Sequence, residues 1–311
     1  MNRSFNPMFL LLFGSLFNAC GWLSASDPQP AERFNRAKGR IQKVAWQTAD
    51  TPGPTQVWGF TLSSDAGLEV RGRLRAPKKE GAYPVAFVVA AYESGSQAID
   101  IIEGCDDLAI VSIDYPIKDH SFSLTHLISD ISDLRQEGIE TVASILLTLD
   151  WLSMHPLSVD SSNITIVTVS FGTFTGIPAA ALDPRASRLA VIQGGGDLSR
   201  VIAANSRRLG LPLPPRFMGW LSRRLLPEFE PNDYIGQVSP RPVVIFGAED
   251  DAYFPEETTL SLYDHAGEPK EIVWRPGGGT SDSKKCRSSK TFPDSPCTNF
   301  TATSATRERH E

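Results

Sequence analysis

Two kinds of hydrophobic pattern follow one another along this chain. Residues 57–62 and 68–74 alternate apolar and polar side chains on either side of a polar turn, which predicts a one-faced antiparallel hairpin. Farther along, apolar residues run almost without interruption in short segments, as is typical of strands buried on both faces of a parallel sheet. These segments are 84–91, 108–113, 164–169, 189–192, 242–246 and 271–274.

Helical periodicity occupies the intervals between these buried strands. From Ile128 to Trp151 apolar residues recur every three or four positions, which predicts an amphipathic helix, and shorter helices are expected at 173–182 and 257–265. The segment 198–237 breaks the rhythm with several prolines and is predicted to be an inserted cap. The expected fold class is α/β, with a mostly parallel mixed sheet, helices on both faces and the antiparallel hairpin at its N-terminal side.

Composition narrows the function classes. The 311 residues carry a net charge of −6 without a long run of Lys or Arg, which argues against a nucleic-acid partner. No CxxC motif or His/Cys cluster predicts a metal. The triple glycine at 194–196 follows a late strand and opens no GxGxxG helix, so no dinucleotide or other cofactor is expected.

The N-terminus has the pattern of an export signal. Arg3 precedes an apolar stretch at residues 8–17, which is too short for a spanning helix but has the length of a signal-peptide core. Residues 1–25 are therefore predicted to direct export, with the mature protein periplasmic or anchored to a membrane. Lipidation at Cys20, cleavage near Ala19 or Ala25, and retention as an apolar arm remain alternatives. Of the other cysteines, Cys286 and Cys297 are candidates for pairing in an oxidising compartment.

A candidate nucleophile lies where a buried strand meets a helix. The residues Thr168-Val169-Ser170-Phe171-Gly172 join the strand at 164–169 to the small-residue helix that follows. A sharp turn there presents a serine hydroxyl above the sheet and directs the helix N-terminus at developing negative charge, as acyl transfer requires. The crowding of such a turn favours glycine two residues before and two after the serine; Gly172 complies and Thr168 does not. The alternative role for Ser170 is that of a helix cap.

These residues carry a family resemblance. Together with Leu149-Asp150-Trp151-Leu152, Ala181-Leu182-Asp183-Pro184-Arg185 and the segment Pro242 to Pro255, they make the chain resemble the α/β-hydrolase fold, and within it the bacterial dienelactone-hydrolase and acetyl-xylan-esterase-related group. The similarity covers about residues 56–279. The hydrolase domain is thus placed at 56–279, after a linker at 26–55. The resemblance implies hydrolysis of an ester or related acyl substrate, and it does not identify that substrate.

The resemblance places the triad acid in the loop after the strand at 242–246. Counting forward from Gly247 selects Asp250, whereas counting back from Pro255 selects Asp251; Asp250 is preferred and Asp251 is the alternative. The oxyanion hole is expected from the backbone N–H of Phe171 and that of Ala91 or Tyr92, in the loop after the strand at 84–91.

The catalytic histidine is missing from its expected place. The family has this histidine in the turn after its last strand, but here the glycines at 277–279 lead into Thr280, which is no general base near neutral pH. Five histidines occur elsewhere, and none is expected to serve as the base: His120, His126, His155, His265 and His310. Surface polar roles are expected for His120 and His126, with substrate binding as the alternative.

The last 32 residues leave two functions open. Residues 280–311 are rich in Ser, Thr, Lys and Arg, lack apolar periodicity and are predicted to be a disordered tail. A Gly-Thr codon pair can contain a histidine codon one base out of step, so a shifted reading frame is one hypothesis. The chain is accordingly predicted to be a serine esterase impaired by the missing histidine; the alternative is a non-catalytic binding protein of the cell envelope.

Overall fold

One mixed sheet runs through the described part of the chain. The computed structural model describes residues 30–49, 51–91, 93–102, 105–118, 120, 122–154 and 159–275. Within these residues the strands pair in the order β1-β2-β3-β5-β4-β6-β7-β8-β9. The strands are β1 (Ile41–Ala49), β2 (Thr55–Ser64), β3 (Glu69–Pro77), β4 (Tyr83–Val89), β5 (Ala109–Ile113), β6 (Val159–Val169), β7 (Ala186–Ile192), β8 (Val243–Ala248) and β9 (Lys270–Arg275).

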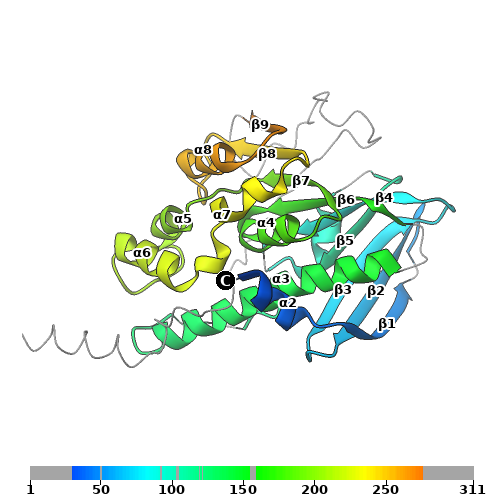
Figure 1. Ribbon diagram of the computed structural model, residues 1–311, viewed down its shortest axis with the longest axis horizontal. Helices are drawn as coiled ribbons and strands as arrows, with labels where there is room; N and C mark the ends of the chain where they lie inside the picture. Colours follow the sequence, from blue (N-terminus) through cyan, green and yellow to red (C-terminus); the bar gives the residue numbers. More distant parts are fainter. Residues whose placement is uncertain are drawn as a thin grey trace, which may run out of the picture.

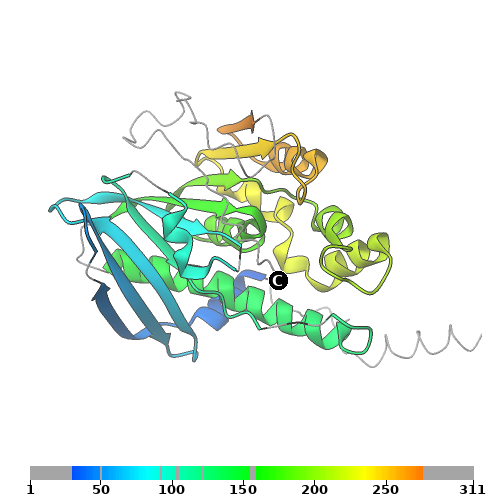
Figure 2. The ribbon, with the colours of Figure 1, turned by 180° about the vertical axis from the view of Figure 1, so that it is seen from behind.

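The sheet has an antiparallel and a parallel part. Strands β1, β2 and β3 pair antiparallel with one another, and β3 also pairs antiparallel with β5. All pairs from β5 through β4, β6, β7 and β8 to β9 are parallel. Figure 2 shows the three antiparallel strands at one edge and β9 at the other. The predicted hairpin, the buried parallel strands and the α/β fold class are confirmed.

Alternate side chains of the parallel strands enter two apolar cores. Val85, Phe87 and Val89 of β4 point into the larger core, which α2 (Pro30–Lys38), α3 (Leu127–Met154), α4 (Thr173–Leu182) and α8 (Glu256–His265) help to build. Ala86 and Val88 point to the opposite face. Among the described residues, the 3-10 helix η1 (Gly95–Asp100) and the side chains of Ile102, Cys105 and Leu108 cover that face. Figure 1 shows α2, α3 and α4 gathered on their side of the sheet.

Residues 30–49 are part of the folded domain, although the sequence pattern placed them in a linker. Helix α2 buries Phe34 completely and packs on α3, where Lys38 pairs with Asp150 at 2.7 Å. Strand β1 adds to the sheet by backbone pairing with β2, while its side chains stay largely exposed. The hydrophobic pattern missed β1 because an exposed edge strand needs no apolar alternation.

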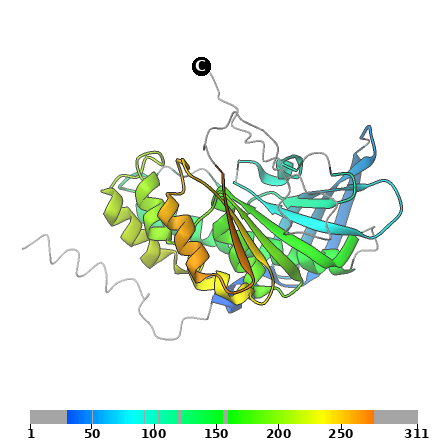
Figure 3. The same ribbon diagram turned by 90° about the horizontal axis from the view of Figure 1, so that it is seen from above.

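Between β7 and β8 the chain leaves the sheet and forms a group of helices, which we call the cap. These are α5 (Leu198–Asn205), α6 (Pro215–Leu225), η3 (Pro227–Phe229), α7 (Asn232–Ile235) and η4 (Gly236–Val238). Figures 1 and 3 show α5 and α6 at the end of the molecule opposite β1. The buried carboxylate of Glu228 accepts hydrogen bonds from Arg33 of α2 and Arg135 of α3, so this group is joined to the main domain by charge-assisted contacts.

Two of the motifs that carry the family resemblance contact each other at the C-terminal ends of α3 and α4. The guanidinium of Arg185 donates to Asp183 at 2.9 Å and to Asp150 at 2.7 Å, and hydrogen bonding to Asp183 raises the pKa of Arg185. Asp150 lies near the C-terminal end of α3, and Asp183 directly follows α4. These motifs therefore join two helices and have a structural role.

Within the described residues, no helix combines the length and apolar character needed to cross a bilayer.

Candidate active site

Ser170 lies at the turn between β6 and α4, in a backbone conformation that residues with side chains rarely adopt. Its φ is +54°, whereas Val169 before it is extended and Thr173 after it is helical. The residue is half-buried, and no described residue accepts or donates a hydrogen bond at its hydroxyl. A left-handed serine at the end of a buried parallel strand, without a hydroxyl partner among the described residues, has the backbone geometry expected of a strand-to-helix nucleophile turn.

Gly172 fits this turn because β4 approaches it closely. A Cβ atom on Gly172 would lie 2.0 Å from the carbonyl oxygen of Val89 and 2.9 Å from that of Ala90. Any side chain here would push the end of β4 away from the serine. A glycine two residues after Ser170 is thus required by the close approach of the end of β4 to this turn.

The structure also explains how threonine is accommodated at position 168. The Thr168 side chain is buried, and its hydroxyl is 3.4 Å from the carbonyl oxygen of Ala190. Its methyl group faces Gly176 of α4, where an added Cβ would lie only 2.4 Å from Thr168 Cγ2. Gly176 has no side chain, and this leaves the space that the Thr168 methyl group occupies. Sequence reasoning missed this compensation because the two residues are eight positions apart and belong to different elements.

The candidate oxyanion donors lie beside the serine. Phe171 is in the first turn after Ser170, where backbone N–H groups have no intrahelical acceptor. Ala91 directly follows the Ala90 carbonyl that approaches Gly172, so the loop after β4 begins next to the turn. Tyr92, the alternative donor, lies outside the described residues.

Tyr115 holds the end of β4 in place. Its hydroxyl donates to the carbonyl oxygen of Ala90 at 2.5 Å, and burial raises the pKa of Tyr115, so the hydroxyl stays protonated as a donor. Tyr115 follows β5, and nothing in its sequence context distinguished it from an ordinary loop residue.

An aromatic cluster joins the serine turn to the loop that follows β8. The ring of Phe171 lies 5.5 Å from that of Phe254 and 6.5 Å from that of Tyr253. Phe174 of α4 completes the cluster at 5.7 Å from Phe171. The turn at Ser170 and the loop with the candidate acids are therefore in contact.

The two candidate acids differ in how they are held. Oδ1 of Asp251 accepts hydrogen bonds from the backbone N–H groups of Tyr253 and Phe254, at 2.8 and 3.0 Å. The carboxylate is thereby oriented by its own loop and bound to the same residues that contact Phe171. Asp250 is exposed, and no described residue forms a hydrogen bond or an ion pair with it.

The loop with Asp251 is also held by the cap. Asn205 at the end of α5 is buried, and its side-chain nitrogen donates to the carbonyl oxygen of Tyr253 at 2.7 Å. Arg208 donates to the carbonyl of Ala252, and its guanidinium lies 5.1 Å from the centre of the Tyr253 ring. The position of this loop therefore depends on α5.

Strand β9 ends beside the loop that carries the candidate acids. It runs parallel to β8, and the backbone N–H of Glu249 donates to the carbonyl of Arg275 at 3.2 Å, one residue before the loop with the acids. Trp274 packs over Gly247, where a Cβ would lie 2.5 Å from the indole ring. Thr280, the position where the family resemblance implies a histidine, lies outside the described residues, as does the tail at 280–311.

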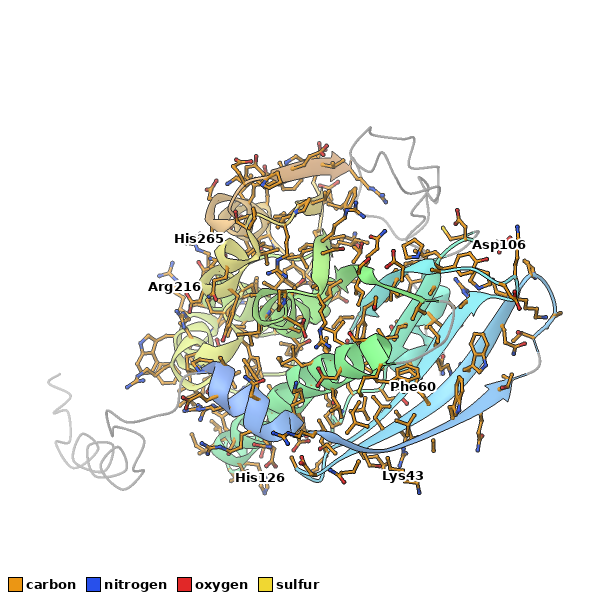
Figure 4. The ribbon with its side chains drawn as sticks, turned by 45° about the vertical axis from the view of Figure 1, so that its right-hand side comes forward. Lys43, Phe60, Asp106, His126, Arg216 and His265 are labelled. Atoms are coloured by element: carbon orange, nitrogen blue, oxygen red, sulfur yellow. The ribbon has the colours of Figure 1, made fainter. Side chains whose placement is uncertain are left out.

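The three described histidines are occupied elsewhere. His120 was expected at the surface, but its side chain is only 7% exposed and Nε2 lies 2.8 Å from the buried carboxylate of Glu137. His126 is exposed and contacts Ser123 at 2.9 Å, and His265 contacts the carbonyl of Ser261 in its own helix at 2.7 Å. Figure 4 shows His126 and His265 on well-separated parts of the molecule. His155 and His310 lie outside the described residues.

Other candidate chemistry can be located only in part. Within the described ranges, no group of three or more His, Cys, Asp or Glu side chains is arranged to hold a metal ion. Cys105 is disulfide-bonded. The lipidation candidate Cys20 and the predicted pair Cys286 and Cys297 are outside the described ranges.

The packing of Thr168 against Gly176 predicts a compensating pair of substitutions. We expect Gly176→Ala to destabilise the protein by about 1–3 kcal/mol, because the new methyl would overlap the Thr168 methyl. In a Thr168→Ser background, which keeps the hydroxyl and removes that methyl, the same change should cost little. Urea unfolding of the four proteins measures the coupling, and equal costs in both backgrounds would contradict this account.

Sequence comparison identifies no relative of this chain. No protein-family model matches it, and no curated protein matches its sequence.

Solved structures do match the fold. Acetyl xylan esterase 1 from Thermoanaerobacterium sp. JW/SL YS485 aligns with a TM-score of 0.59 and 14% identity over 81% of this chain and 88% of its own. An acetyl xylan esterase from Paenibacillus sp. R4 aligns with a TM-score of 0.61 and 16% identity over 82% and 91%. An alpha/beta hydrolase from Penicillium sp. sh18 aligns with a TM-score of 0.51 and 18% identity over 77% and 92%. With the observed sheet order and the turn at Ser170, these likenesses show that the chain has the α/β-hydrolase fold.

Proposed function

We propose that this protein is a serine hydrolase that cleaves a small or medium carboxylic ester through Ser170. The observation that carries the proposal is the left-handed backbone of Ser170, which leaves a hydroxyl without a partner among the described residues at the end of β6. The names of the two acetyl xylan esterases that share the fold favour a carboxylic ester, such as an acetyl ester, as the substrate class.

The chemistry is acyl transfer in two steps. The Ser170 oxygen attacks the ester carbonyl while its proton passes to a base, and the carbonyl oxygen becomes an oxyanion that the N–H groups of Phe171 and of Ala91 or Tyr92 stabilise. Collapse expels the alcohol, which takes up the proton. Water then attacks the acyl-enzyme, releasing the carboxylic acid and restoring the serine hydroxyl.

The acid of this triad is proposed to be Asp251, with Asp250 as the alternative. Two backbone N–H groups already fix one carboxylate oxygen of Asp251. The other oxygen can therefore orient an imidazole without a further loss of side-chain conformational entropy. The resemblance implies a histidine base on the chain that leaves β9 beside this loop, and Thr280 stands at that position in this sequence.

A second candidate function is supported by the histidines. His120, His126 and His265 each have a polar contact that does not involve Ser170. Without a base at position 280, the same fold would act as a non-catalytic binding protein. For either function we propose export through the apolar residues 8–17, followed by residence in the cell envelope as a periplasmic or lipid-anchored protein.

Labelling with a fluorophosphonate tests whether Ser170 is a nucleophile. We expect the probe to modify Ser170, because a serine in an oxyanion-binding turn displaces fluoride from phosphorus, and mass spectrometry locates the adduct. Ser170→Ala should abolish labelling, while Ser129→Ala, an exposed serine of α3, should leave it unchanged. Absence of labelling together with absence of p-nitrophenyl acetate hydrolysis would refute the hydrolase proposal.

Restoring a histidine tests whether the base is the missing part. We expect Thr280→His to accelerate p-nitrophenyl acetate hydrolysis by roughly 10²–10⁴-fold, the usual contribution of a positioned general base. The acceleration should be lost in Thr280→His/Ser170→Ala. The matched control is Ser281→His, which places the same side chain one residue away. No gain in the Thr280 variant, with no labelling of Ser170, would favour the binding protein.

The two aspartates can be separated in the Thr280→His background. Asp251→Asn should lower kcat by about 100-fold or more, because it removes the charge that stabilises the imidazolium while keeping the oxygen that accepts the two backbone N–H groups. Asp250→Asn should change kcat less than twofold, since its exposed carboxylate has no described partner. The reverse ranking would assign the role to Asp250.

A further inference from the structure

The cap carries positive charge that the acyl chemistry does not use. Residues 198–227 contain six arginines and no aspartate or glutamate, whereas the whole chain has a net charge of −6. In an acidic protein, a segment that carries only basic charge makes the surface potential asymmetric. This asymmetry lies in α5, α6 and their connection, which Figures 1 and 3 show at the end of the molecule opposite β1.

Aromatic side chains accompany this charge on the outer side of α6. Phe217 and Trp220 are 42% and 50% exposed, and their rings lie 5.5 Å apart. At 3.6 residues per turn, positions 216, 217, 220 and 224 share one side of the helix, and all four are exposed. Met218 and Leu221 bury the other side. Figure 4 shows Arg216 on the outside of the cap.

Three exposed arginines of the cap have no counter-ion within the described part of the chain. The side chains of Arg207, Arg216 and Arg224 form no ion pair or hydrogen bond there. The carboxylates that follow α6 are already engaged: Glu228 by Arg33 and Arg135, Glu230 by the backbone N–H groups of Asp197 and Leu198, and Asp233 by Arg223. We call the exposed residues Arg207, Leu209, Arg216, Phe217, Trp220 and Arg224 the cap surface.

We propose that the cap surface docks on an anionic phospholipid bilayer. Trp and Phe side chains bury their rings at the boundary between headgroups and acyl chains, and guanidinium groups pair with lipid phosphates. Each basic residue near an anionic leaflet adds to the attraction. The negative charge on the rest of the protein is repelled by the same surface, so the molecule docks with α6 facing the lipid. This inference is independent of whether Ser170 is catalytic.

Hydrogen exchange on the full chain provides a local measurement. Amides in peptides covering residues 206–226 should become protected when vesicles of phosphatidylcholine with 30% phosphatidylglycerol are added, and should stay unprotected with pure phosphatidylcholine. Protection should fall at 0.5 M NaCl because the attraction is electrostatic. The local readout separates the cap from the apolar stretch at residues 8–17, which is the same in every variant.

Matched variants separate charge from aromatic burial. Arg207→Gln/Arg216→Gln/Arg224→Gln should raise the lipid concentration needed for half-maximal protection of the cap. Each removed charge should raise it about fivefold, so the triple variant should need roughly 100-fold more lipid. Phe217→Ser/Trp220→Ser should weaken the protection of the cap at both low and high salt. The control Lys43→Gln/Trp46→Ser changes an exposed cation and an exposed aromatic residue of β1, far from the cap, and should have no effect.

Three results would overturn the proposal. They are equal protection with neutral and anionic vesicles, wild-type protection in the triple arginine variant, and binding of the cap to heparin without any protection by anionic vesicles. The last outcome would identify a soluble polyanion as the occupant of the cap surface. Unchanged exchange elsewhere in the variants, before lipid is added, checks that they are folded.

Discussion

Ser170 occupies left-handed backbone space, which costs about 1–3 kcal/mol for a residue with a side chain, so its surroundings have to hold it there. The carbonyls of Val89 and Ala90 press against Gly172 on one side, and Thr168 packs on Gly176 on the other. Tyr115 donates a hydrogen bond to the carbonyl of Ala90 and so holds the C-terminal end of β4. Each of these contacts belongs to a different element, and together they leave one conformation for the turn.

The same turn determines how the rest of the site is assembled. Phe171, the residue whose N–H is the proposed oxyanion donor, packs on Tyr253 and Phe254, and the backbone of these two residues holds Asp251. The proposed nucleophile, oxyanion donor and acid are thus connected through one aromatic cluster. A shift of the loop after β8 would move both Asp251 and the rings that contact Phe171.

The cap is connected to this cluster and to the lipid-facing surface proposed for α6. Asn205 and Arg208 bind the loop backbone beside Tyr253, and both lie in or directly after α5, which packs on α6. Glu228 joins the far side of the cap to α2 and α3. Helix α5 thus lies between the surface proposed to face lipid and the loop that carries Asp251.

Sequence by itself determined the buried strands, the long helix α3, the serine at a strand-to-helix junction and the absence of a histidine after the last strand. Periodicity and local motifs carry these features because each depends on residues close together in the chain. It placed α2 and β1 in a linker, since an exposed edge strand has no hydrophobic signature, and it took His120 for a surface residue. Only the tertiary structure decided that Gly176 makes room for Thr168, that Asp251 is held while Asp250 is exposed, and that Tyr115 and Asn205 support the site. Those roles arise from contacts between different elements or from the folding of a loop, which no pattern of apolar and polar residues records.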